Sequence, residues 1–433
     1  DSVDTTSDYR DKLPVNMMPI KKKVLGAQGY LLMHSGLTQF ARGTGVDRAG
    51  IWNERLLAHL PVSGQKLVAI DAGGSVLELG NISGIDTASM PYSFNTQGIV
   101  ADKKFWLWNE TIGLMQITDP DLGEPVDGVW VDGYYFFTDG EYLFHSNLTD
   151  DPPTDPSDFI DPLRYATAEF SPDPTLGVGK TVDNKVIVFG RYSTEYFSNV
   201  STENFAFSRL PSRAIKTGIV GTHCKTEMNN QWYILGGRKE EDVSVYNISV
   251  GNASKIASRE VDKVINLYTE SQMRTSVLET RVQDDQHLII IHLPQHTLMF
   301  NLDVAEAVGL EMAWTILKSD VTGNKPWRGI HGIFEPRLTK FVYGDKQNDL
   351  IGILDDTVTT EYGKLKEYII YTPFVYLEQM SIEEIDVDTI AGYTRDKDAT
   401  VAVSLTYDGA HYTKEVWAQY GIPSAYQTRL PLL

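Results

Sequence analysis

Close pairs of carboxylates are the first residues in this sequence that could do chemistry. They occur at Asp119 and Asp121, at Asp284 and Asp285, and at Asp355 and Asp356. A glycoside hydrolase needs two carboxyl groups about 5–10 Å apart across a cleft. Adjacent residues on a strand point to opposite faces, and the other pairs lie in predicted turns, where aspartate is favoured because it hydrogen-bonds to the backbone. The pairs therefore indicate turns more than a catalytic centre.

Histidine and cysteine give no stronger sign of a reactive site. His292 and His296 have a spacing that would suit a metal on a helix, but Pro294 lies between them and the surrounding sequence predicts strand and turn. Cys224 follows His223, and neighbours on a strand cannot pair as nucleophile and base. Cys224 is the only cysteine, which excludes a disulfide within the chain. We expect no catalytic residue, cofactor or metal.

The charge of the chain argues against tight binding to nucleic acid. The sequence has 38 Lys and Arg against 58 Asp and Glu, a formal net charge of −20. Phosphate binding depends on Lys and Arg, which release counterions from the nucleic acid. No apolar run reaches the roughly 20 residues of a membrane span. Residues 1–8 lack the basic and apolar regions of a signal peptide.

Seven strand pairs provide the scaffold that would hold any functional residues. Each is a short strand, a polar turn and a second strand, rich in aromatic and β-branched residues. The pairs are 66–70 with 75–79, 104–108 with 113–117, 134–137 with 142–144, 185–189 with 195–198, 231–235 with 243–246, 288–291 with 297–300, and 340–343 with 350–354. Successive pairs start about 30–55 residues apart, which brackets the repeat length of propeller blades.

This pattern predicts an all-β protein with a β-propeller of seven blades over residues 51–370. Residues 56–60 and 129–131 are predicted as further strands that complete four-stranded blades. The Gly-His and Trp-Asp signature of WD repeats is missing, and a pair of β-sandwiches would give similar local signals.

A helical insert near residues 258–280 interrupts the strand pattern. Val261, Val264, Ile265 and Tyr268 fall on one face of a helix. Thr269 with Gln272 fits a capping box that would start a second short helix.

Three segments are predicted to contact partners. Residues 1–50 are predicted to form an irregular N-terminal arm whose basic run is the only compact one in the chain, and residues 150–162 form a long Pro/Asp loop. The contact residues proposed in the arm, the loop and the helical insert are Lys21, Lys22, Lys23, Asp155, Asp158, Arg259, Asp262 and Lys263. The alternative for the arm and the loop is an ordinary solvated surface.

After residue 371 the pattern changes to that of a small β-sandwich, which we assign to residues 371–433. The segments 381–387, 400–405 and 412–417 alternate apolar and polar residues and are predicted as antiparallel strands.

Short motifs spread over most of the chain resemble one known family. They are KLPVN at 12–16, TEYF at 194–197, GIVGTHCKT at 218–226, ASREVDK at 257–263, YTE at 268–270, HLIIIHLP at 287–294, WRG at 327–329 and YGDK at 343–346. In their order and spread they resemble the packaged-DNA stabilisation proteins of short-tailed bacteriophages, which form the tail hub of the head-to-tail connector.

The resemblance implies a structural, non-enzymatic virion protein made in the host cytoplasm. It implies docking beneath the portal and adaptor, closure of the DNA channel after packaging, and seats for the tail needle and tailspikes. Six copies would form a homohexamer around the tail axis, and genomic DNA would pass without specific binding.

A carbohydrate-binding or glycoside-hydrolysing propeller is the alternative function, because exposed Trp106, Trp108, Trp130 or Trp232 could stack on sugars. Alternating aromatic residues in strands are, however, mainly blade core.

Overall fold

The computed structural model describes residues 12–23, 26, 29–43, 62–148, 153, 155–168, 170–323, 325–372, 382–394, 399–423 and 425–431. The chain divides into two compact units, one of residues 14–369 and one of residues 1–13 with 370–433. This division lies beside the boundary at 370/371 that the sequence predicts. No helix in the described ranges has both the length and the hydropathy needed to cross a membrane.

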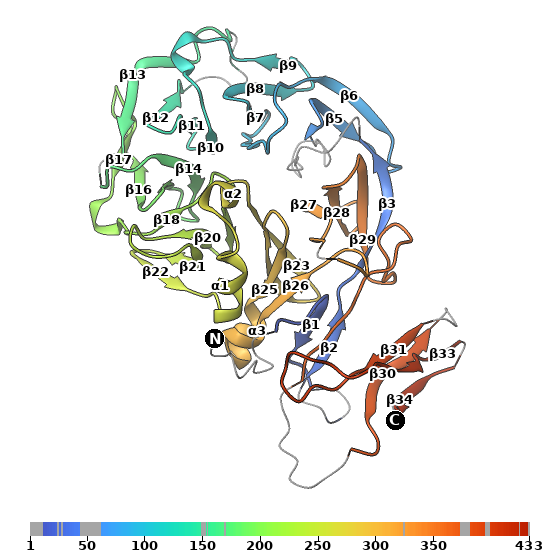
Figure 1. The fold of residues 1–433 in the computed structure, drawn as a ribbon. Coiled ribbons are helices and arrows are strands. Elements are labelled where there is room, and N and C mark those ends of the chain that lie inside the picture. Colours follow the sequence, from blue (N-terminus) through green and yellow to red (C-terminus); the bar gives the residue numbers. More distant parts are fainter. Residues whose placement is uncertain are drawn as a thin grey trace. The chain divides into compact units, whose positions relative to one another are not determined.

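In the first unit, seven antiparallel sheets of the described chain follow one another around a ring (Figure 1). Two sheets have three strands: β4 (Val62–Ser63), β5 (Lys66–Ile70) and β6 (Val76–Asn81), then β7 (Gln97–Ala101), β8 (Lys104–Asn109) and β9 (Gly113–Gln116). Next come β10 (Asp127–Val131), β11 (Tyr134–Thr138), β12 (Tyr142–Ser146) and β13 (Ile160–Thr167), then β14 (Thr175–Lys180), β15 (Val186–Gly190), β16 (Thr194–Asn199) and β17 (Phe207–Arg209).

The remaining three sheets have four or five strands. The first contains β18 (Gly218–Ile219), β19 (Lys225–Met228), β20 (Gln231–Gly237), β21 (Ser244–Ser249) and β22 (Asn252–Lys255). The second contains β23 (Val277–Gln283), β24 (Gln286–His292), β25 (Thr297–Asn301) and β26 (Trp314–Leu317). The third joins β27 (Gly329–Glu335), β28 (Lys340–Asp345) and β29 (Leu350–Asp355) to β3 (Gly36–Arg42) from near the N-terminus.

All seven predicted strand pairs are present as hydrogen-bonded neighbours. The all-β class is therefore confirmed, and so is the strand at 129–131, which lies in β10. Five of the sheets have the four or more strands expected of a complete blade. The strand predicted at 56–60 lies outside the described residues.

Apolar clusters between consecutive sheets form the core of this unit. Each cluster takes the inward-facing alternate residues of two sheets, as sheet packing requires. Examples are Leu67, Ile99 and Trp106 between β4–β6 and β7–β9, and Phe105, Phe137 and Phe144 between β7–β9 and β10–β13. Full burial of such a side chain contributes about 1.5–3 kcal/mol, so these clusters stabilise the packing of consecutive sheets.

The prediction of an irregular arm for residues 1–50 is wrong for residues 17–20, 30–33 and 36–42, which form strands. Besides β3, this stretch holds a hairpin of β1 (Met17–Ile20) and β2 (Tyr30–Met33). His34 donates a hydrogen bond to Asn16 O, so hydrogen-bonded pairs alternate along the hairpin from that pair. The pair of Pro19 and Leu31 is one of those between them, so the missing N–H of proline costs no hydrogen bond there.

The helices lie mainly in one part of the first unit. They are α1 (Arg259–Ile265), α2 (Glu270–Met273), α3 (Leu302–Val308), and the 3-10 turns η2 (Pro120–Leu122), η3 (Pro211–Arg213) and η4 (Leu310–Met312). The predicted helical insert is confirmed, including the capping box of Thr269 and Gln272 at the start of α2. The sequence did not predict α3, which the side chain of Asn301 caps.

The described part of the second unit contains the strands β30 (Asp386–Thr394), β31 (Thr400–Val403), β32 (Val416–Gln419), β33 (Ile422–Pro423) and β34 (Gln427–Pro431). β30 lies between β33 and β34, and β31 pairs with β32. The predicted strand at 400–405 is β31. The strands predicted at 381–387 and 412–417 instead begin at Asp386 and Val416, because the apolar alternation in the sequence starts several residues before the first residues that pair.

Candidate functional site

A buried carboxylate ties the first strands of several sheets together near the centre of the ring. Asp127 starts β10 and is 2% exposed. Its Oδ2 accepts hydrogen bonds from Lys225 Nζ at 2.7 Å and from the Val178 amide at 2.8 Å, while Ser89 Oγ donates to its Oδ1 at 2.5 Å. These partners belong to three other sheets or their leading segments. This network therefore fills space near the ring axis with paired charges.

A second buried polar network lies between the sheet β23–β26 and the sheet β27–β29, which β3 completes. We call this interface the closure seam. Arg281, which is 1% exposed, donates to Tyr343 Oη at 3.3 Å, and its Nη2 lies 3.0 Å from His34 Nε2. Lys366 lies on the other side of His34 and donates to Ser35 O at 2.7 Å. Burial, followed by the two nearby cations, lowers the pKa of His34 well below its usual value.

The inner end of the closure seam holds a carboxylate and an imidazole. His292 Nε2 lies 2.9 Å from Glu279 Oε1, and Glu279 Oε2 accepts a hydrogen bond from the Gly332 amide at 3.0 Å. Burial lowers the pKa of His292 to about 4 and the pKa of His331 to about 3, so both rings are neutral at pH 7. The contact between Glu279 and His292 is therefore one of a buried carboxylate with a neutral imidazole, beside the hydrogen bond from the Gly332 amide.

The paired carboxylates that the sequence singled out serve turns and loops. Asp119 accepts the amides of Phe159 and Ile160 at 2.6 and 2.7 Å and so holds the end of the Pro/Asp loop. Asp284 and Asp285 both have positive φ in the turn between β23 and β24. Asp355 caps its own turn by accepting the Thr357 amide, and Asp356 accepts a hydrogen bond from Ser35 Oγ.

The histidine and cysteine pairs also have structural partners. The thiol of Cys224 is buried against the carbonyls of Met273 and Ser276, and burial raises its pKa to about 12. His296 contacts the Tyr268 hydroxyl. Within the described ranges, no group of three or more His, Cys, Asp or Glu side chains is placed to hold a metal ion.

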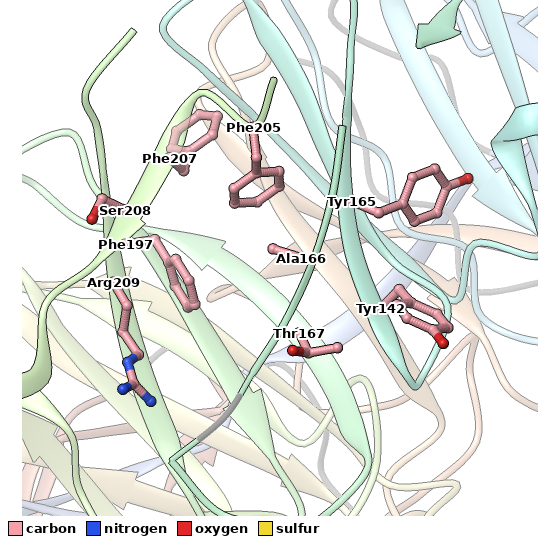
Figure 2. A pocket seen from close by; sticks show the side chains of 9 residues that line it. All are labelled: Tyr142, Tyr165, Ala166, Thr167, Phe197, Phe205, Phe207, Ser208 and Arg209. Carbon is pink, nitrogen blue, oxygen red and sulfur yellow. The ribbon is translucent and has the colours of Figure 1, made fainter. Parts of the chain in front are cut away.

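A hollow of about 510 Å³ lies between the outer strands of two neighbouring sheets. Figure 2 shows the rings of Phe197, Phe205 and Phe207 on one side and those of Tyr142 and Tyr165 on the other. Arg209 at its rim pairs with Glu195 at 3.4 Å. The lining is aromatic and lacks the two carboxylates that sugar hydrolysis requires.

The three predicted contact residues of the helical insert differ in their roles. Asp262 is an anchor, because it accepts a hydrogen bond from Ser244 Oγ at 2.6 Å and pairs with Lys255 at 2.5 Å. Arg259 and Lys263 lie on the exposed side of α1. The insert is thus fixed to its sheet by Asp262 and presents basic side chains outward.

The basic run of the N-terminal segment directly follows β1. Lys21, Lys22 and Lys23 are all exposed. Lys21 Nζ donates to the carbonyl of Ala307 at 2.8 Å, at the C-terminal end of α3, where the helix dipole favours a cation. Lys21 therefore has a structural role, whereas Lys22 and Lys23 point from the surface.

The predicted contact residues of the Pro/Asp loop are also exposed. Asp155 Oδ1 accepts hydrogen bonds from the amide and hydroxyl of Ser157, which lower the pKa of Asp155. The carbonyl of Asp158 accepts a hydrogen bond from Asn147. The described partners of these residues differ from segment to segment: Lys21 contacts the end of α3, Asp262 contacts β21 and β22, and Asp155 contacts Ser157.

The buried networks at the ring axis and in the closure seam were not anticipated from the sequence. A signal was present, since the charged Glu279 and Arg281 and the polar Gln283 alternate along a strand whose other residues are Val, Leu and Thr. Buried charges at alternate positions of a strand indicate pairing across a sheet interface. In the described chain these networks join neighbouring sheets through buried ion pairs and hydrogen bonds.

Comparison with known proteins gives consistent matches over both units. Residues 1–359 match the family model described as bacteriophage P22 Gp10, β-propeller, and residues 367–432 match the model described as bacteriophage P22 Gp10, β-sandwich. The tail hub protein gp10 of Salmonella phage P22 is 28% identical over 443 residues, which cover 98% of this chain and 89% of that protein.

Solved structures with some likeness include the extracellular domain of a one-component system from B. thetaiotaomicron and the Pan2 WD40 domain from Neurospora crassa. The first is 9% identical with a TM-score of 0.47, covering 74% of this chain and 40% of the other chain. The second is 6% identical with a TM-score of 0.45, covering 75% and 97%.

The family matches confirm a β-propeller followed by a C-terminal β-sandwich. Together they span nearly the whole described chain, in the order that the structure gives. The chain belongs to the bacteriophage P22 Gp10 family, the tail hub proteins that stabilise packaged DNA.

Proposed function

We propose that this protein docks beneath the portal and adaptor of a short-tailed phage after DNA packaging. There it closes the DNA channel, retains the genome, and provides seats for the tail needle and tailspikes. The observation that carries this proposal is the match of both units to one tail-hub family, over 98% of the chain in the case of the P22 relative.

The proposed action is steric and makes or breaks no covalent bond. Each copy would contribute a rigid propeller with broad loop-rich faces, and six copies would surround the tail axis through heterologous contacts. The proposed DNA path runs between copies rather than through the ring of one copy.

The charge of the chain supports passage of DNA without specific binding. A formal net charge of −20 disfavours contact with phosphates. We infer that the protein is made in the host cytoplasm and functions in the virion, where partner proteins rather than DNA supply its binding energy.

The proposal is tested with DNA-filled heads that carry portal and adaptor but lack the hub. The purified protein is added, the heads are sedimented, and nuclease-accessible DNA is measured over time. We expect co-sedimentation and a halt in DNA leakage. Heads without the adaptor are the matched control and should bind little protein. A protein that stays in the supernatant with both kinds of head would refute the proposal.

A further inference from the structure

Strand β2 has an open edge on the surface of the first unit. Of the described strands, only β1 pairs with β2. His34 donates to Asn16 O, so by the alternation of an antiparallel pair the peptide groups of Leu31 and Met33 point away from β1. The side chains of these two residues are also 41% and 38% exposed. An edge of this kind accepts an extended segment by strand addition.

A pair of lysines lies at the end of the same hairpin. Lys22 and Lys23 are exposed and follow β1 directly, while Lys21 is held by the end of α3. The chain as a whole is strongly acidic. Lys21–Lys23 is the compact basic run in its sequence. A partner for the open edge should therefore be apolar and negatively charged.

The second unit carries a segment of that chemistry. Residues 382–385, of sequence Ile-Glu-Glu-Ile, precede β30 and belong to no described strand. Ile382 is 44% exposed, and Glu383 and Glu384 are exposed beside it. The segment thus has free strand-forming length, an apolar side chain and two carboxylates.

We propose that residues 382–385 of one copy add to the edge of β2 in the next copy, with Glu383 and Glu384 facing Lys22 and Lys23. The inference rests on the proposed function, because it supplies the contact between neighbouring hub subunits. Two different patches meet, so the contact is heterologous and can propagate around a ring.

Charge reversal on each side tests this pairing. The variants are Lys22→Glu with Lys23→Glu, and Glu383→Lys with Glu384→Lys. All four residues are exposed, so each variant should keep the wild-type circular dichroism and melting temperature. Lys103→Glu with Lys104→Glu is the matched control; both residues are exposed, Lys103 in the turn after β7 and Lys104 at the start of β8. Copies bound per DNA-filled head, and association in sedimentation at low ionic strength without heads, are measured for each.

We expect each reversed variant alone to lose about tenfold or more in assembly, because like charges then face each other. An equimolar mixture of the two variants should regain assembly, since every contact in an alternating ring is again between opposite charges. The control variant should behave as wild type.

The outcomes separate this inference from the proposed function. If the wild-type protein does not bind to heads, the hub function is contradicted. The contact between copies is then still tested by sedimentation without heads. A further outcome is that assembly is restored by a single chain that carries all four changes but not by the mixture of the two double variants. That result would place the pairing within one copy and overturn the inference. Reversed variants that assemble like wild type in both arms would overturn it as well.

Discussion

Buried ion pairs between residues far apart in the sequence stabilise this protein, and the sequence alone does not indicate which residues pair. Asp127 and Lys225 are 98 positions apart, and nothing in the local sequence indicates that they meet. The turn residues are different, because Asp284, Asp285 and the capping box of Thr269 act on their immediate neighbours. Residue roles within a turn could therefore be predicted, whereas roles across sheets could not.

Replacing Asp127 should be among the most destabilising single changes in the propeller. Asp127→Ala leaves Lys225 buried without its carboxylate and the Val178 amide without its acceptor, which we expect to cost about 3–5 kcal/mol. Glu124→Ala removes an exposed partner of Lys103 and should cost less than about 1 kcal/mol. Chemical denaturation monitored by tryptophan fluorescence compares the two. If Asp127→Ala lowers the free energy of unfolding by as little as Glu124→Ala, the network around Asp127 contributes little to stability.

His145 should make stability depend on pH. The ring is 1% exposed, its Nε2 accepts the Ala206 amide at 3.0 Å, and burial lowers its pKa to about 4. The unfolded ring takes up a proton near pH 6.5, so stability is full above that pH and falls as the pH drops toward 4, by roughly 3 kcal/mol. His145→Gln should flatten this dependence in denaturation curves at pH 7, 5.5 and 4.5. An unchanged slope would contradict the assignment.

Among the elements, the strand pairs were predictable and the strand that closes the ring was not. Each pair is local, with two short strands joined by a polar turn, so periodicity and turn residues suffice. β3 pairs with β29, more than 300 positions away, and Pro14 and Pro19 made the preceding segment resemble an irregular arm. The helix α3 was missed because it is only seven residues long and is held by the cap from Asn301 and by Lys21.

Loss of packing at β3 should destabilise the whole ring. Leu37 is fully buried between the closing sheet and its neighbour, so Leu37→Ala should cost about 2–5 kcal/mol. Leu77→Ala, in β6, removes a side chain that is 64% exposed and should have little effect. Thermal melts of both variants test this. A small effect of Leu37→Ala would show that closure does not depend on β3.

The helical insert should matter for assembly more than for folding. Reversing Arg259 and Lys263 to Glu changes two exposed charges of α1 and leaves the anchor at Asp262 intact. We expect the monomer to melt normally and binding to DNA-filled heads to weaken by about tenfold. Normal binding in the sedimentation assay would assign the insert a purely structural role.

At the scale of the whole molecule, two units of one family are joined in an acidic chain. The order of units could be inferred from the change of strand pattern near residue 371, and the structure separates them after Ile369. The exposed residues of the arm, the loop and the insert, which lie far apart in the sequence, are the partner contacts we propose. Which patch meets which partner depends on surfaces of other chains, which a single sequence does not contain.

The central claim, that the protein is a hub beneath the portal, is tested most directly by electron cryo-microscopy of DNA-filled heads after addition of the purified protein. We expect six copies around the tail axis below the adaptor, with DNA density ending at or between the propellers. Propellers bound elsewhere on the capsid, or heads with no added density, would contradict it.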